Sequence, residues 1–380
     1  MSFIDTYICA LILMRLANLL NRSFPPIAEW AEQNHLKIAP AKSSVTLFTP
    51  WNRQFQAHPR VLLNDTVLPL ERNPKILGVR LDPSLTFTPH VKEIAHKCNS
   101  RLNILKALSG TSWGHQKETL AVTYGALIKP VMTYAAPVWY PSTCASNIRT
   151  LQSVQSKALR VICGSHKMAN LHHLHAETKT LPVREELDLL CKQYLASSLR
   201  TAHPSHQQVI SEPGPRADRR VGTLRSKFLP SIQHLLTNGI TPPSDYKCIL
   251  KELHTSSVQS YLHSAPPNKV LLAPPPAIAD EETRLPRHFR TTLSQLRSGY
   301  CARLNGYRQR IGLTSSDLCP ECELAPHTVS HLFSCQSHPT LLSPEDLWLR
   351  PVEVASLLGN MTAFDGLPPL EPPVPPPPPG

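Results

Sequence analysis

Four residues of the kind that bind metal ions lie close together in the last quarter of the chain. Cys319, Cys322, His331 and Cys335 follow the pattern C-x2-C-x8-H-x3-C. Two thiolates separated by two residues can face one point from a single turn, and a three-residue gap puts His331 and Cys335 one helical turn apart. Zn²⁺ in structural sites takes four such ligands at the corners of a tetrahedron. The spacing therefore predicts a structural zinc site whose closed shell leaves no position for catalysis.

Two nearby histidines are alternative ligands for the metal ion. His327 and His338 flank the pattern, but only His331 stands at a spacing from Cys335 that suits one helical turn. The other interpretation is a chance cluster in a chain with ten cysteines.

The other cysteines are scattered along the sequence: Cys9, Cys98, Cys144, Cys163, Cys191, Cys248 and Cys301. This distribution is typical of a reducing compartment, nuclear or cytoplasmic, rather than of a secreted disulfide framework.

Prolines limit where helices can form, and the 39 prolines of this 380-residue chain are about twice the ordinary share. Apolar residues recur at helical spacing where prolines are few, over residues 90–108, 118–130, 146–163 and 183–199. We expect these segments to form a helical bundle over residues 90–200.

Residues 1–89 combine an apolar segment with strand-like patterns. The segment 1–26 is apolar but interrupted by Asp5, Arg15 and Asn18, and it lacks a basic leader, so a buried helix or a misassigned start codon is favoured over membrane insertion. Over residues 27–89 a helix is expected to end near Asn34. Short strands follow, around the Asn64-Asp65 turn and over residues 76–82. The region 27–89 is predicted to form small hairpins against a helix.

The C-terminal half divides into three predicted parts. Repeated prolines and a basic stretch at 216–227 predict a flexible linker over 201–285, with short helices such as 257–263. Residues 286–340 combine an Arg-rich helix, expected over 290–311, with the metal-binding module. The segment 341–380 ends in a nearly all-proline tail, 367–380, which predicts extended polyproline II and a ligand for a polyproline-binding domain.

The net charge of +12 favours a polyanionic partner, nucleic acid before an acidic membrane. Arginines and two tyrosines on or near the 290–311 helix offer phosphate contacts and stacking, although an ordinary amphipathic helix also explains them. No Gly-rich phosphate loop, H-E-x-x-H or G-x-S-x-G motif is present. The sequence His172-His173-Leu-His175-Ala-Glu177 is interpreted as a polar loop between two helices rather than a metal site.

The order of several segments resembles one protein family. These segments are WAEQN (30–34), IAPAKS (38–43), LGVRLD (77–82), YGALIKP (124–130), YAAPVW (134–139), LQSVQ (151–155), LHAETKTLP (174–182) and QLRSG (295–299). Together with the cysteine cluster they resemble the C-terminal half of LINE-type, non-LTR retrotransposon reverse transcriptases, especially the jockey-like group. The likeness runs from about Trp30 to Pro351.

The resemblance implies an α+β fold with defined parts. Residues 27–89 would be the end of a polymerase palm, with Leu77, Gly78 and Val79 in a primer-grip-like hairpin. Residues 90–200 would be a helical thumb, followed by the flexible linker and a small zinc module. Charge and resemblance together give the candidate nucleic-acid-binding residues Lys42, Arg297, Arg303, Arg308 and Arg310.

One departure from the family pattern concerns its chemistry. The family's polymerases hold two metal ions on palm aspartates, including an adjacent pair, and this sequence contains no Asp-Asp pair. We therefore expect a truncated reverse-transcriptase copy that binds RNA or DNA without sequence specificity and is not itself an enzyme. The alternative is a structural or interaction protein that uses the helical bundle and the proline tail.

Overall fold

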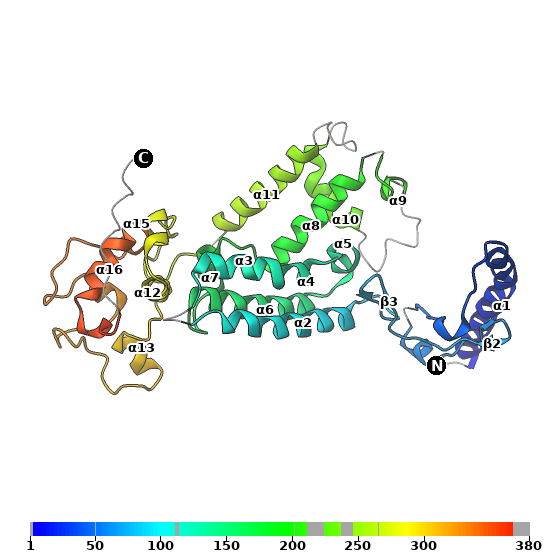
Figure 1. Ribbon diagram of the computed structural model, residues 1–380, viewed down its shortest axis with the longest axis horizontal. Coiled ribbons are helices and arrows are strands. Elements are labelled where there is room, and N and C mark those ends of the chain that lie inside the picture. The colour runs from blue at the N-terminus through cyan, green and yellow to red at the C-terminus, as the bar shows by residue number, and fades with distance from the viewer. Residues whose placement is uncertain are drawn as a thin grey trace. The chain divides into compact units, whose positions relative to one another are not determined.

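The computed structural model describes residues 3–49, 51–110, 114–200, 202–210, 224–236, 246–264 and 266–367 (Figure 1). The proline tail beyond Leu367 and most of the basic stretch, 216–223, lie outside the described residues. The α-helices are α1 (Phe3–Gln33), α2 (Thr88–Ala107), α3 (Lys117–Leu127), α4 (Lys129–Thr133), α5 (Ala136–Trp139), α6 (Ala145–Cys163), α7 (Leu171–Thr178), α8 (Val183–Ser198), α9 (His206–Ile210), α10 (Leu224–Ile232), α11 (Tyr246–His263), α12 (Arg287–Arg297), α13 (Asn305–Arg310), α14 (Val329–Leu332), α15 (Asp346–Leu349) and α16 (Pro351–Gly359). The strands are β1 (Leu62–Leu63), β2 (Thr66–Val67), β3 (Lys75–Ile76) and β4 (Val79–Arg80).

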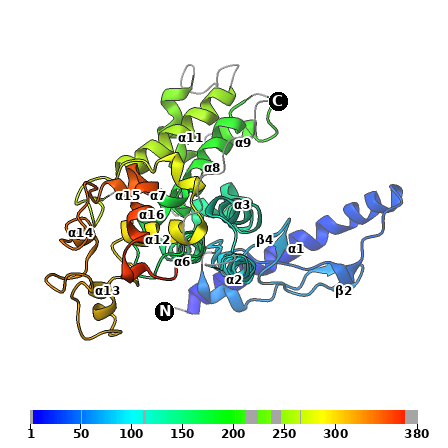
Figure 2. The same cartoon turned by 60° about the vertical axis from the view of Figure 1, so that its left-hand side comes forward.

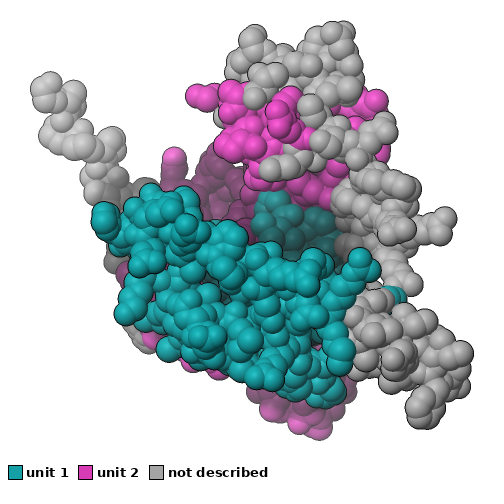
Figure 3. Space-filling view, turned by 90° about the vertical axis from the view of Figure 1, so that its right-hand side faces the viewer, with its two compact units in different colours: residues 1–93, 137–147, 213–223 teal, residues 94–136, 148–212, 224–380 magenta. Residues whose placement is uncertain are grey.

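The chain divides into two compact units, which Figure 3 shows in different colours. The described part of unit 1 comprises residues up to 93 and residues 137–147. Unit 2 holds most of the helices and the C-terminal region. Helices with two small two-stranded sheets agree with the predicted α+β class.

The long helix α1 runs across the predicted boundary at residue 26. It runs without a break from Phe3 to Gln33 and contains Pro25 and Pro26. Its Ala17 packs into a small core with Val61, Leu63 and Leu68. Among the described residues, no helix is both long and apolar enough to cross a membrane.

Both sheets of unit 1 are tight antiparallel hairpins. Asn64 and Asp65 join β1 to β2 with φ angles of 48° and 59°, which is the left-handed pair that a type I′ turn requires, so the predicted turn is confirmed. The single strand predicted over residues 76–82 is wrong, because β3 and β4 reverse direction at Leu77 (φ 47°) and Gly78 (φ 86°). Gly78 therefore serves the turn itself.

The predicted helices of the bundle are confirmed within a few residues as α2, α3, α6 and α8. Helices α2, α3 and α6 lie side by side in two views (Figures 1 and 2). Two glutamines on α6 connect the bundle internally. Gln155 Nε2 donates to the hydroxyl of Tyr124 at 3.1 Å and to the carbonyl of Leu181 at 3.0 Å. Gln152 Oε1 accepts from the backbone N–H of Val183 at 2.9 Å, which ties the start of α8 to α6.

Part of the predicted flexible linker, 201–285, is ordered structure. Helices α10 and α11 both pack against α8, and α11 runs for 18 residues rather than the short helix expected over 257–263. Phe228, Ile232, Ile249 and Leu253 are buried there. The prolines divide this region into separate helices, and its buried apolar residues pack those helices against the bundle.

Helix α12 docks onto the C-terminal end of α6. Arg287 donates to the carbonyls of Ile162 and Val161 at 3.3 and 3.2 Å, where the last carbonyls of a helix lack partners within the helix. Gly164 ends α6 with φ 65°, and a Cβ there would lie 2.4 Å from Thr291 Cγ2. The close approach of the two helices therefore depends on a glycine at this position.

A buried ionic cluster holds α3, α7, the short 3₁₀ helix Asp280–Arg284 and α12 together. Lys117 Nζ lies 2.9 Å from Glu177 and 3.0 Å from Glu282. Arg297 pairs with the same two carboxylates, 3.0 Å from Glu177, and its side chain is 0% exposed. Arg290 forms a bidentate salt bridge with Glu118. The basic and acidic side chains are equal in number, so the cluster is neutral as a whole.

Opposite charges keep this cluster ionised despite its burial. Burial alone would lower the pKa of Lys117, but the carboxylates of Glu177 and Glu282 outweigh it and hold that pKa above its usual value. For Glu177, burial would raise the pKa, while Lys117 and Arg297 hold it well below its usual value. Lys117 and Glu177 therefore depend on their oppositely charged neighbours for their own charge.

Helix α12 also forms one wall of a C-terminal apolar core. Phe289, Leu293 and Leu296 pack there with residues of α14, α15 and α16, including Trp348 and Val354. The continuous helix expected over 290–311 is wrong, because Gly299, with φ 72°, follows α12 and a separate helix α13 begins at Asn305.

We expect Arg297→Ala to lower the free energy of unfolding by about 3–5 kcal/mol, because it leaves two buried carboxylates with Lys117 as their shared partner. Urea denaturation followed by circular dichroism measures this change. Arg308→Ala is the matched control, since Arg308 is exposed, and it should change stability by no more than about 0.5 kcal/mol. Equal effects of the two substitutions would contradict the role given to the cluster.

Candidate metal centre and nucleic-acid surface

The first two cysteines of the cluster lie on a tight loop. Leu318 and Pro326 form an antiparallel bridge at its base, and the N–H of Cys319 donates to the carbonyl of Ala325 at 2.9 Å. The N–H of Glu323 donates back to the carbonyl of Cys319 at 2.9 Å, and Glu323 itself adopts φ 54°. This turn brings the thiols of Cys319 and Cys322 to one side.

The other two ligands come from a single helical turn and the residues after it. Thr328 caps α14, and its hydroxyl accepts a hydrogen bond from the backbone N–H of His331. The three-residue gap predicts His331 and Cys335 on one face of a helix, but α14 ends at Leu332. Cys335 therefore reaches the site from the turn that follows the helix.

The four side chains converge as a tetrahedral metal site requires. Their ligand atoms all lie within 4.8 Å of one another. Cys319 Sγ and Cys335 Sγ are 4.0 Å apart, and Cys322 Sγ lies 3.3 Å from His331 Nε2. A tetrahedron with Zn–S bonds of about 2.3 Å and Zn–N bonds of about 2.0 Å has edges of roughly 3.5 to 3.8 Å. The cluster thus has the size and the ligand types of a zinc knuckle.

The surroundings of Cys322 and Cys319 shift the pKa values of the two thiols in opposite directions. The backbone N–H groups of Leu324 and Ala325 point toward Cys322 and hold the pKa of its thiol below the usual value, with Leu324 contributing most. Burial raises the pKa of Cys319. A bound cation would reverse that effect, because metal binding displaces the proton from the thiol.

The two alternative histidines have other partners. His327 is 1% exposed, and its Nδ1 accepts from the backbone N–H of Asn305 at 3.2 Å. His338 Nε2 lies 3.2 Å from the carboxylate of Glu321. Neither belongs to the converging cluster, which contains His331 as the sequence spacing indicated.

Hydrogen bonds and apolar contacts join the metal loop to the C-terminal core. Glu321, between the first two cysteines, accepts hydrogen bonds from the backbone N–H and the hydroxyl of Thr362 at 2.7 and 2.5 Å. Val329 and Leu332 of α14 are buried in the core shared with α12 and α16. The loop is therefore part of unit 2 rather than an isolated module.

The structure corrects one of the predicted nucleic-acid contacts. Arg297 is fully buried in the ionic cluster, where its Nε also donates to the carbonyl of Leu347 at 2.9 Å, so it is not available to a phosphate. Arg308 and Arg310 are exposed on α13, beside the metal loop in sequence. Arg303 is half-buried and donates to the carbonyl of Asp365. Lys42 is exposed in unit 1.

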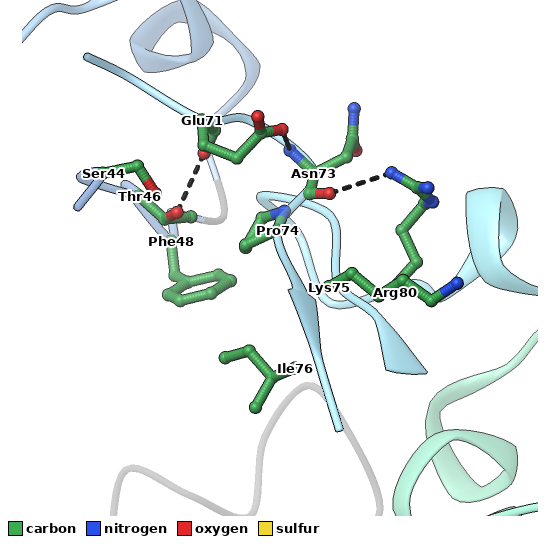
Figure 4. Close-up of a pocket in the computed structure, with 9 residues that line it drawn as sticks. All are labelled: Ser44, Thr46, Phe48, Glu71, Asn73, Pro74, Lys75, Ile76 and Arg80. Atoms are coloured by element: carbon green, nitrogen blue, oxygen red, sulfur yellow. Dashed lines mark hydrogen bonds between the residues drawn. The ribbon is translucent and has the colours of Figure 1, made fainter. Parts of the chain in front are cut away.

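The residues of the hairpin predicted to be primer-grip-like differ in their exposure to solvent. Leu77 is 87% exposed at the tip, next to Gly78, whereas Val79 is buried. Beside the hairpin lies an open hollow lined by Phe48, Ile76 and Arg80, among others (Figure 4). Arg80 and Lys75 at this hollow both pair with Glu93, at 2.9 and 2.7 Å, which reduces their attraction for a phosphate.

The carboxylates that pair with the buried Arg297 are not apparent in the sequence pattern. The pattern around Glu177 predicts a polar loop, but Glu177 lies on α7, and Glu282 lies in a 3₁₀ helix within the predicted linker. One signal was available. Arg290 and Arg297 share a helical face with Leu293, so two arginines stand where the pattern calls for apolar residues. Such an arrangement predicts buried partners of opposite charge.

About half of the chain is similar in sequence to RNA-directed DNA polymerases of mobile elements. It is 27% identical over 191 residues to the probable RNA-directed DNA polymerase from transposon X-element of Drosophila melanogaster, which covers 47% of this chain and 20% of that protein. It is 25% identical over 177 residues to the probable RNA-directed DNA polymerase from transposon BS of the same species, covering 47% and 19%. The RNA-directed DNA polymerase from mobile element jockey of Drosophila funebris is 25% identical over 194 residues, covering 51% and 19%.

These similarities confirm the resemblance to jockey-like non-LTR retrotransposon polymerases. The matched part of the chain spans about a fifth of the length of these relatives. No protein-family profile matches the chain. No solved structure matches it.

We expect the purified chain to bind one zinc ion per molecule, as measured by elemental analysis in reducing buffer. Cys322→Ser should abolish tight binding because it removes one of the thiolates that the tetrahedron needs. Cys301→Ser is the matched control, since Cys301 is buried in the apolar core outside the cluster. A zinc content near zero, or equal loss from both variants, would show that the cluster does not bind zinc.

Proposed function

We propose that this chain binds RNA or DNA without sequence specificity, as part of the reverse-transcription machinery of a jockey-like non-LTR retrotransposon. The observation that carries the proposal is the Cys319–Cys322–His331–Cys335 cluster in a chain with a net charge of +12. The similarity to RNA-directed DNA polymerases supports the same partner, because a polymerase of this kind must hold a template and a primer.

Zinc would serve this function as a structural element. Four protein ligands close its shell, so it supplies no open coordination position and takes no part in a chemical step. Its effect would be to fix the loop 319–335 beside α13, where Arg308 and Arg310 are exposed. Two guanidinium groups on a fixed surface contact phosphates with less loss of side-chain freedom than they would on a mobile loop.

The chain on its own is proposed not to polymerise DNA. Nucleotide addition requires two metal ions held by closely spaced carboxylates. The sequence has no Asp-Asp pair. The buried carboxylates Glu177 and Glu282 are neutralised by Lys117 and Arg297, so they are not free to hold magnesium.

Binding to a single-stranded RNA should weaken as salt increases, with a log–log slope that contains roughly −0.7 for each phosphate neutralised. Reversing two charges on α13 with Arg308→Glu and Arg310→Glu should weaken binding and reduce the slope by about 1.4. Fluorescence anisotropy at several salt concentrations measures both quantities.

The matched control reverses two exposed charges of α6, with Arg149→Glu and Lys157→Glu. This pair changes the net charge equally, so it separates a local contact from a general field effect. Equal losses in the two double variants would place the binding surface elsewhere. Undetectable binding of the unmodified chain at low salt would refute nucleic-acid binding altogether.

The purified chain should not extend an annealed primer in the presence of Mg²⁺ or Mn²⁺, because its sequence has no Asp-Asp pair to hold the two metal ions. A gel-based extension assay with a protein-free control measures this. Template-dependent extension above the control, retained through purification, would contradict the proposal.

A further inference from the structure

A second concave site lies in unit 2, away from the metal cluster. It is a cavity of about 500 Å³ between α7, the end of α11 and the proline-rich segment 266–278. Helix α7 and one end of α11 lie next to each other in both ribbon views (Figures 1 and 2). Its volume falls within the range of small-ligand pockets, roughly 300–1,000 Å³. Neither the metal cluster nor the exposed arginines of α13 contribute to it.

Aromatic rings and prolines form much of the wall. The rings of His172 and Tyr261 are stacked, with centroids 5.4 Å apart and an angle of 11° between their planes. His175 meets Tyr261 edge-on at 5.8 Å. Trp348 and Pro276 complete the lining at other points. A wall of this kind suits a flat ligand that stacks rather than a branched aliphatic one.

A neutral histidine and a paired carboxylate line the cavity together with two lysines. Burial lowers the pKa of His175 to about 4, so its ring is neutral. Glu177 lines the cavity but is paired with Lys117 and Arg297. Two exposed lysines, Lys179 and Lys269, belong to the lining. An uncharged group attached to an anionic backbone would match this distribution of charge.

Polar groups at the cavity offer directional contacts. Asn170 accepts a hydrogen bond from the N–H of His172 through its carbonyl oxygen, which leaves its amide nitrogen to donate. Thr180 donates its hydroxyl to the carbonyl of Thr178, so its oxygen can still accept. One donor and one acceptor near a stacking surface are the elements with which proteins read the edge of an unpaired base.

We propose that this cavity takes one unpaired nucleobase of a bound single strand, stacked against the His172–Tyr261 pair, with the flanking phosphates on Lys179 and Lys269. The inference rests on the proposed nucleic-acid binding and adds a defined base subsite to it. Aromatic stacking accepts every base, so the subsite contributes affinity with little sequence preference.

A proline-rich peptide is the competing occupant, because aromatic-lined grooves also bind polyproline helices. The observations favour the base. A polyproline helix needs an extended groove for successive residues, whereas this site is a bounded cavity whose lining includes neutral polar groups and two exposed lysines. The competing ligand is therefore included in the test.

The test uses the full chain and a short uridine-rich RNA that carries one 2-aminopurine, whose fluorescence falls when it stacks. Ala277 is exposed and lines the cavity, so Ala277→Trp should fill it without removing a wall residue. Ala273→Trp is the matched control in the same segment, outside the cavity lining. A second variant, Tyr261→Leu, removes the stacking ring, with Tyr134→Leu as its control at a tyrosine that is 55% exposed elsewhere.

The unmodified chain and both controls should quench 2-aminopurine. Ala277→Trp and Tyr261→Leu should lose the quenching and bind the RNA on the order of tenfold more weakly. RNA binding without quenching, or quenching unchanged in Ala277→Trp, would overturn the base subsite while leaving the proposed function intact.

Free 2-aminopurine riboside separates the two proposals. If the chain fails to bind RNA but quenches the riboside in an Ala277→Trp-sensitive way, the pocket assignment stands and the nucleic-acid function fails. If neither probe is affected, both fail. A synthetic peptide of residues 367–380 that binds the unmodified chain, and not Ala277→Trp, while the riboside does not bind, would assign the cavity to a polyproline ligand instead.

Discussion

The pairing of Arg297 with Glu177 and Glu282 is the interaction on which the architecture of unit 2 depends. It joins α12 to α7 and to the segment before α12, and Lys117 extends the same contact to α3. A buried charge without a partner is costly, so removing one member of this cluster destabilises the packing of all four elements. The metal loop packs on the core that α12 shares with α14 and α16, which connects the zinc-knuckle residues to the helical bundle through α12.

Local patterns in the sequence predicted local structure well. The apolar periodicity over 146–163 and 183–199 gave α6 and α8 nearly to the residue, because each helix buries one continuous stripe against its neighbours. The Asn64-Asp65 turn was predictable because few residues other than glycine adopt its left-handed conformation readily. The ordering of α10 and α11 was not predictable, since prolines mark where helices end but do not reveal which apolar residues find partners.

The same distinction explains the outcome at the candidate sites. The metal cluster could be predicted because its four ligands lie within one short segment, so their spacing alone brings them together. The burial of Arg297 could not be derived from spacing, because its partners come from positions 120 and 15 residues away in the sequence. The cavity of unit 2 could not be predicted for the same reason. Its wall joins α7 to α11 and to the proline-rich segment 266–278, which are separate in the sequence.

The proposed function places nucleic acid against α13 and the adjoining metal loop of unit 2. Photo-crosslinking can locate the bound strand. The zinc-loaded chain is irradiated with a single-stranded RNA containing 4-thiouridine, and the attached peptides are identified by mass spectrometry. We expect crosslinks to peptides from the segment 303–335, lost when excess unlabelled RNA competes. Competable crosslinks confined to unit 1, or to α10 and α11, with none in 303–335, would contradict it.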